Sequence, residues 1–206
     1  MDTRELLKKA KEFEERGDDA KAYQYRLEAA IEDNDGTALN ELAKMYMEGD
    51  YVGLDFDKAA HYFELAYEKG FDLSGELFVF VGSGYENGDR YREKAPETAM
   101  KWYKMAADEG VDYAYACMGE MYFKGEGMEQ DYKKAYDLFK KSGEQETLPL
   151  YYLGLMYEEG LYVDADRKKA KEYYERVVKE HRDCKAYGDL HYELAEKRLT
   201  AMKLRR

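Results

Sequence analysis

The chain has 206 residues, of which 45% are hydrophobic and 38% are charged, and it contains only two prolines and two cysteines. Its net charge of −12 argues against a general nucleic-acid-binding protein, because phosphate contacts need clustered lysine and arginine side chains. No apolar run approaches the roughly 18 residues of a membrane span, and Met1-Asp2-Thr3-Arg4-Glu5 lacks the apolar core of a signal peptide.

Residues 1–35 predict one helical hairpin. Ala10, Phe13, Ala22 and Tyr25 follow the period of amphipathic helices, and a short turn is expected around Gly17.

Residues 36–182 contain four copies of one pattern. A small residue is followed three positions later by tyrosine and after three more by glycine, as in Ala43-Tyr46-Gly49 and Gly154-Tyr157-Gly160. Ten or eleven positions after that glycine comes an alanine, and four positions later an aromatic residue. A repeat of this length predicts stacked pairs of helices. The alanine–aromatic pairs are Ala59 and Phe63, Ala99 and Tyr103, Ala135 and Phe139, and Ala170 and Tyr174.

Each repeat carries signals for how its two helices meet. The recurring small residue predicts close contact with the second helix, and Ala43 suggests that alanine is accepted at this place. Asp55, Asp131 and Asp166 are expected to cap the second helices, and Pro96 suits the first turn of another.

The C-terminal residues 183–206 predict a capping helix and a basic tail. We expect one long helix from Asp183 to Lys203, with Leu190, Leu194 and Leu199 as its apolar stripe. The fold expected for 1–206 is therefore a single all-α domain, a right-handed α-solenoid of stacked antiparallel helix pairs.

The repeat pattern resembles the Sel-one-like repeat family, a branch of the tetratricopeptide superfamily. The resemblance rests on Met118-Gly119 and Leu153-Gly154 before the tyrosine, and on the pairs Lys58-Ala59, Lys134-Ala135 and Lys169-Ala170. A second loop glycine typical of the family is present only as Gly127; the other repeats have Tyr51, Arg90 and Tyr162. The resemblance implies an adaptor or scaffold that holds a peptide or a domain in its concave face.

By analogy with the superfamily, the first helices line that concave face. Phe123, Tyr151 and Leu155 would form an apolar strip flanked by carboxylates, or else they cover neighbouring helices. Tyr51 and Tyr162 would seal the loops against the next repeat or make contacts at the edge. This composition predicts a basic or amphipathic peptide as the partner. The predicted binding residues of this chain are Asn40, Lys44, Met47, Val79, Ser83, Glu86, Glu120, Phe123, Lys124, Tyr151, Leu155, Glu158 and Glu159.

Other functional classes have less support in the sequence. His61, His181 and His191 have no metal-ligand spacing, so neither a metal nor a cofactor is predicted. A hydrolase is one alternative, because this activity has been attributed to some relatives that pair cysteines within each repeat. Cys117 and Cys184 are far apart in the sequence and do not form such a pair. A purely structural spacer is the other alternative. We expect a non-enzymatic, monomeric protein in the cytoplasm, where unpaired cysteines are usual.

Overall fold

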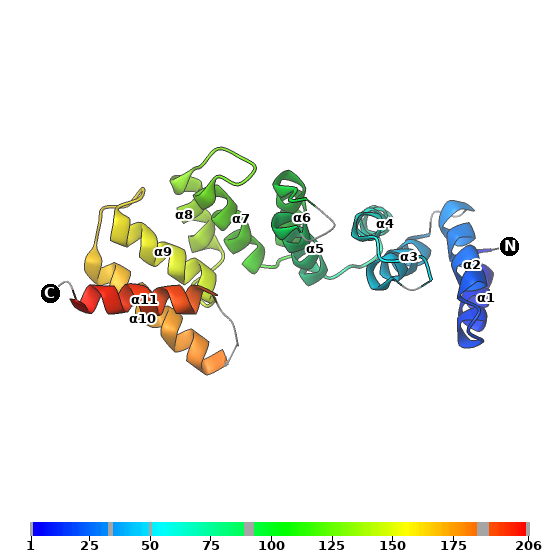
Figure 1. The fold of residues 1–206 in the computed structure, drawn as a ribbon. Coiled ribbons are helices and arrows are strands. Elements are labelled where there is room, and N and C mark those ends of the chain that lie inside the picture. The colour runs from blue at the N-terminus through cyan, green and yellow to red at the C-terminus, as the bar shows by residue number, and fades with distance from the viewer. Residues whose placement is uncertain (1, 33–34, 50, 89–92, 185–189, 205–206) are drawn as a thin grey trace. The chain divides into compact units, whose positions relative to one another are not determined.

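The computed structural model describes residues 2–32, 35–49, 51–88, 93–184 and 190–204 (Figure 1). Within these ranges all regular secondary structure is helical, which confirms the all-α prediction. The chain forms two compact units, Met1–Leu73 and Ser74–Arg206. The expected single domain over 1–206 stays a prediction.

The first unit consists of two helical hairpins. Helix α1 (Thr3–Glu15) pairs with α2 (Asp19–Glu32), α3 (Gly36–Glu48) pairs with α4 (Phe56–Glu68), and α2 also packs against α3. Arg26 of α2 is buried, and its guanidinium donates to Glu14 Oε2 at 2.7 Å and to Glu41 Oε2 at 2.6 Å. One cation therefore ties α1, α2 and α3 together.

The second unit contains three hairpins and a final helix. The pairs are α5 (Gly75–Asn87) with α6 (Pro96–Asp108), α7 (Tyr113–Lys124) with α8 (Tyr132–Lys141), and α9 (Thr147–Glu159) with α10 (Arg167–Cys184). Helix α11 (Leu190–Leu204) packs on both α9 and α10 (Figure 1). Antiparallel helix pairs closed by a C-terminal helix are the predicted repeat architecture.

The repeated glycines lie against the second helix of their own pair, as predicted. A Cβ atom added to Gly154 would lie 2.8 Å from Cε1 of Tyr174, and one added to Gly82 would lie 2.7 Å from Cε1 of Tyr103. Both rings are buried, so even a methyl group must displace them. The expectation that alanine is accepted at Gly154 is therefore wrong.

The aspartates and the Lys-Ala pairs define the start of the second helices. Asp55 Oδ1 accepts from the Lys58 backbone N–H at 3.0 Å, and Asp131 and Asp166 cap their helices in the same way. The lysine then lies over the repeated tyrosine, with Lys58 Nζ 5.0 Å from the centroid of Tyr46. This cation–π contact explains why lysine precedes the buried alanine in three repeats.

Tyr51 and Tyr162 take the left-handed conformation that glycine usually supplies, with φ of 61° and 65°, and Gly127 has φ of 75°. Their rings contact Tyr23 at 5.8 Å and Tyr136 at 5.6 Å between centroids. Both partners belong to the preceding hairpin and not to the next repeat, whereas the alternative role in contacts at the edge stays a prediction.

The C-terminal helix differs from the expected Asp183–Lys203 element. Helix α10 continues to Cys184, and α11 begins at Leu190. Leu190 is 60% exposed, whereas Leu194 and Leu199 pack against the core. The sequence carries a helix-ending residue and a capping residue here, Gly188 and Asp189, and the expected single helix disregards them. Residues 185–189, and Arg205 and Arg206 of the basic tail, lie outside the described residues.

Glu144 joins the turn between α8 and α9 to helix α10. Its carboxylate accepts from Arg176 and Lys140 and, at 3.1 Å, from the Tyr173 hydroxyl. Burial alone would raise the pKa of Glu144, but these hydrogen bonds outweigh it and lower the pKa to about 2.

Glu144→Gln is expected to lower the free energy of unfolding at pH 7 by about 1–2 kcal/mol, a range already reduced for solvent screening. Because the folded pKa is lowered, the ionised carboxylate stabilises the fold above its ordinary pKa near 4.3, and this contribution disappears as the pH falls to about 2. Urea unfolding of both proteins at pH 7 and pH 3 measures it. A difference that stays constant between these pH values would contradict the assignment.

Candidate protein-binding surface

Two first helices carry a glutamate held in place by a tyrosine of the partner helix. The ring of Tyr103 crosses Gly82, and its hydroxyl donates to Glu86 Oε2 at 2.5 Å. The ring of Tyr174 crosses Gly154, and its hydroxyl donates to Glu158 Oε2 at 2.8 Å. The glycine thus lets a buried ring reach a carboxylate one turn further along the first helix.

The two other repeats lack both members of this pair. The aromatic residue is Phe63 or Phe139, and the residue four positions after the small one is Met47 or Phe123. Hydroxyl and carboxylate therefore occur together in two repeats and are absent together in two. This correlation is visible in the sequence. The repeat positions were used only to predict helix packing, so the tyrosine–glutamate pairs were not predicted.

Glu120 adds a third fixed carboxylate on α7. It accepts from the Tyr152 hydroxyl of α9 at 2.8 Å, and its Oε1 lies 2.6 Å from Lys124 Nζ. Glu86, Glu120 and the nearby Glu126 all interact with the ammonium group of Lys124, so several carboxylates gather near this one described lysine.

The electrostatics of this surface favour an added cation. Burial raises the pKa of Glu86, and repulsion from Glu120 and Glu126 raises it further, although the Tyr103 hydrogen bond opposes the shift. A positive group placed here would reduce that repulsion. Tyr113, which is 37% exposed, starts the same face of α7 and offers an aromatic surface beside the carboxylates.

The predicted residues of the first unit lie on α3. Asn40 is only 6% exposed, and its Oδ1 is, among the described side chains, a buried atom without a hydrogen-bond partner. Lys44 is exposed and Met47 is half-buried. Asn40, Lys44 and Met47 therefore belong to the first unit, and the other predicted residues belong to the second. In the second unit, Val79 and Ser83 of α5 are half-buried and share the helix with Glu86.

The side chains of the predicted apolar strip pack against other residues of the second unit. Phe123 packs between Tyr132 and Tyr152, with centroid distances of 5.2 and 4.8 Å. Tyr151 and Leu155 are buried, and the Tyr151 ring lies 5.5 Å from His191 of α11. Tyr151 and Leu155 are therefore not open to a partner in this conformation.

Glu158 and Glu159 face the C-terminal helix. Arg198 Nη1 lies 3.3 Å from Glu158 Oε2 and 3.4 Å from Glu159 Oε1. The contact spans about 40 residues, and no local pattern indicates it.

The described ranges show neither a metal-binding cluster nor a membrane-spanning helix. They contain no group of three or more His, Cys, Asp or Glu side chains placed to hold a metal ion. In the part of the chain that the structure describes, every helix is too short or too polar to span a bilayer. The Cys117 thiol is buried, which raises its pKa, and it forms no disulfide.

Comparison with solved structures identifies the fold. A Sel1 repeat protein from Oxalobacter formigenes is 27% identical, with a TM-score of 0.55 over 88% of this chain and 49% of that one. The protective antigen c5321 from uropathogenic Escherichia coli, which has the same repeat fold, is 24% identical, with a TM-score of 0.63 over 98% of this chain and 44% of that one.

Two curated relatives from Arabidopsis thaliana are also similar in sequence. HRD3A and HRD3B, each described as an ERAD-associated E3 ubiquitin-protein ligase component, are 30% and 27% identical over 142 and 141 residues. Each alignment covers 65% of this chain, which spans only 20% and 23% of the length of these relatives.

The family model for the Sel1 repeat matches four segments, residues 36–71, 79–111, 113–146 and 150–176. They coincide with the hairpins α3–α4, α5–α6, α7–α8 and α9–α10 and cover more than half of the chain. The chain therefore belongs to the Sel1 repeat family.

Proposed function

We propose that this chain is a non-enzymatic scaffold that binds a protein segment on the first-helix surface of its second unit. Sel1 repeat proteins generally mediate protein–protein interaction and are typically non-catalytic. The observation that carries the proposal is the set of fixed carboxylates on α5 and α7. Glu86 is held by Tyr103, and Glu120 is held by Tyr152 and Lys124.

The proposed partner is a basic or amphipathic segment. Lysine or arginine of the partner would pair with Glu86 and Glu120, and the partly exposed side chain of Tyr113 would contact an apolar or cationic side chain. Since tyrosine hydroxyls already orient both carboxylates, binding would order few additional side chains.

The curated relatives support only the general part of this proposal. Both are components of a larger ligase assembly by their names, and this chain matches about a fifth of each. We carry over the role of a protein-binding component and not the ubiquitin ligase context. We further propose a monomer in a reducing compartment such as the cytoplasm, in keeping with the free thiol of Cys117.

Site-specific photocrosslinking in the native cell tests this function. A benzoylphenylalanine at Ser83, one turn from Glu86 on α5, is expected to give a discrete covalent adduct whose partner segment contains lysine or arginine. The matched control is the same residue at Lys168 of α10, whose side chain is 88% exposed. Identical adducts from both positions, or none from Ser83, would contradict the proposed surface.

A further inference from the structure

Helix α11 is held by both apolar and polar contacts, and Tyr192, Leu194 and Leu199 are partly buried against the core. Within its described residues only Ala195 and Met202 are buried, whereas α9 buries nine residues. Arg198 reaches Glu158 and Glu159 of α9, and Arg167 of α10 donates to the Met202 carbonyl at 2.7 Å.

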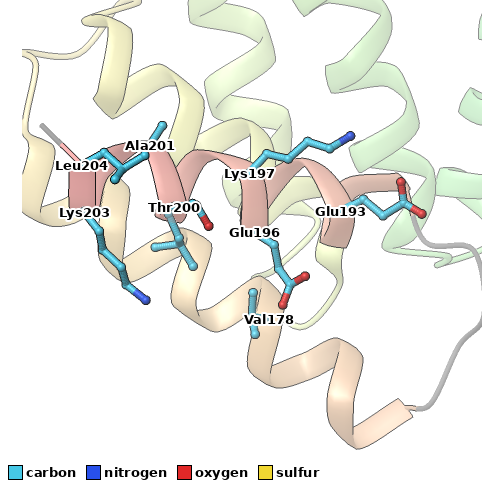
Figure 2. A pocket seen from close by; sticks show the side chains of 9 residues that line it. Val178, Glu193, Glu196, Lys197, Thr200, Ala201, Lys203 and Leu204 are labelled. Carbon is cyan, nitrogen blue, oxygen red and sulfur yellow. The ribbon is translucent and has the colours of Figure 1, made fainter.

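The junction of α11 with α10 is incompletely filled. A groove of about 770 Å³ runs along α11, with Val178 of α10 among its lining residues, and Figure 2 shows Glu196, Thr200 and Lys203 projecting from α11 on the side of Val178. A second groove of about 370 Å³ lies beside Met202 and Arg167. Helices with few buried apolar contacts open at low free energy.

The surface beneath α11 has the composition of a helix-binding site. Tyr151 contacts His191, and it belongs to one apolar cluster with Leu155, Ala195 and Met202. Glu158 and Glu159 lie beside this cluster and receive the guanidinium of Arg198. An apolar groove with an acidic rim complements an amphipathic basic helix.

We propose that the α9–α10 surface is a binding site for a basic amphipathic helix, and that α11 occupies it as an intramolecular ligand. The contacts of α11 define the motif: a small residue at position i, arginine at i+3, and apolar residues at i+4 and i+7, filled here by Ala195, Arg198, Leu199 and Met202. A partner helix with this motif would displace α11. The proposal concerns α9 and α10 and does not depend on the α5–α7 surface.

Fluorescence anisotropy with the full chain and a labelled peptide of residues 190–204 tests this. In the Arg198→Glu chain, α11 loses its pairing with Glu158 and Glu159, and the site opens. The wild-type peptide is therefore expected to bind the Arg198→Glu chain at least about tenfold more tightly than it binds the unaltered chain. The matched control is Lys197→Glu, the same charge reversal at the adjacent exposed position, which should bind as weakly as the unaltered chain.

A charge swap provides the second readout. Hydrogen exchange of the α11 amides should accelerate in full-length Arg198→Glu and return toward the original rate when Glu159→Lys is added, a change that leaves the Tyr174–Glu158 hydrogen bond in place. Glu86→Gln should change neither measurement, which separates this site from the proposed α5–α7 surface. Equal peptide binding by Arg198→Glu and Lys197→Glu, or α11 exchange that Arg198→Glu does not accelerate, would overturn the proposal.

Discussion

Tyr174→Ala is expected to lower the free energy of unfolding of the second unit by about 3–5 kcal/mol, the range for removing a buried aromatic side chain. Tyr174 is fully buried, its ring lies on Gly154, and its hydroxyl holds Glu158. The substitution therefore removes core packing, leaves a cavity and releases a carboxylate. Chemical denaturation followed by tyrosine fluorescence and circular dichroism measures the loss.

Two phenylalanine variants separate packing from hydrogen bonding. Tyr174→Phe keeps the ring and loses only the bond to Glu158, so about 1.5–3 kcal/mol is expected, the range for a hydrogen bond to a charged group. The matched control is Tyr136→Phe, whose hydroxyl lies 3.4 Å from the Tyr157 hydroxyl and should contribute below about 0.5 kcal/mol. Equal losses in Tyr174→Phe and Tyr174→Ala would show that the ring is not a packing element.

Gly154→Leu has the second largest expected effect, a loss of about 3 kcal/mol at the upper end of overpacking. Its Cβ alone would lie 2.8 Å from the Tyr174 ring and 3.2 Å from Tyr173 Cβ, so the two helices must separate. Gly154→Ala should cost less, about 1 kcal/mol, because its gain in helix propensity offsets part of the clash.

A double-mutant cycle identifies the cause of that loss. If leucine acts through the ring, then Gly154→Leu combined with Tyr174→Ala should be more stable than the sum of the two single changes predicts. Additive losses would mean that residue 154 acts through another neighbour.

Much of the fold follows from the sequence because its signals are local. Asp55, Asp131 and Asp166 cap helices whose starts they mark, and the small residue of each repeat fixes where the second helix crosses. The separate helices α10 and α11 were not predicted, because the apolar spacing alone does not show where one helix ends, and the signal of Gly188 and Asp189 was not used. Leu190 was predicted to belong to the buried stripe because one continuous helix was expected. It is exposed at the start of α11.

The candidate surface was predicted less completely. The first helices were identified correctly as elements, and Glu86, Glu120 and Glu158 were named on them. The roles of Tyr103, Tyr152 and Arg198 depend on contacts between residues 17 to 40 positions apart in the sequence. Tyr151 was chosen as an anchor because helix periodicity gives its direction, but periodicity does not reveal that α11 covers it.

The most direct test of the proposed function is selection of peptides from a random display library on the full chain. The comparison protein carries Glu86→Gln and Glu120→Gln, which keep acceptors for the Tyr103 and Tyr152 hydroxyls and remove the charges. We predict that peptides enriched in lysine or arginine bind the unaltered chain and lose at least about tenfold in affinity on the comparison protein. Selected peptides without basic residues, or with equal affinity for both proteins, would contradict a carboxylate-based protein-binding surface.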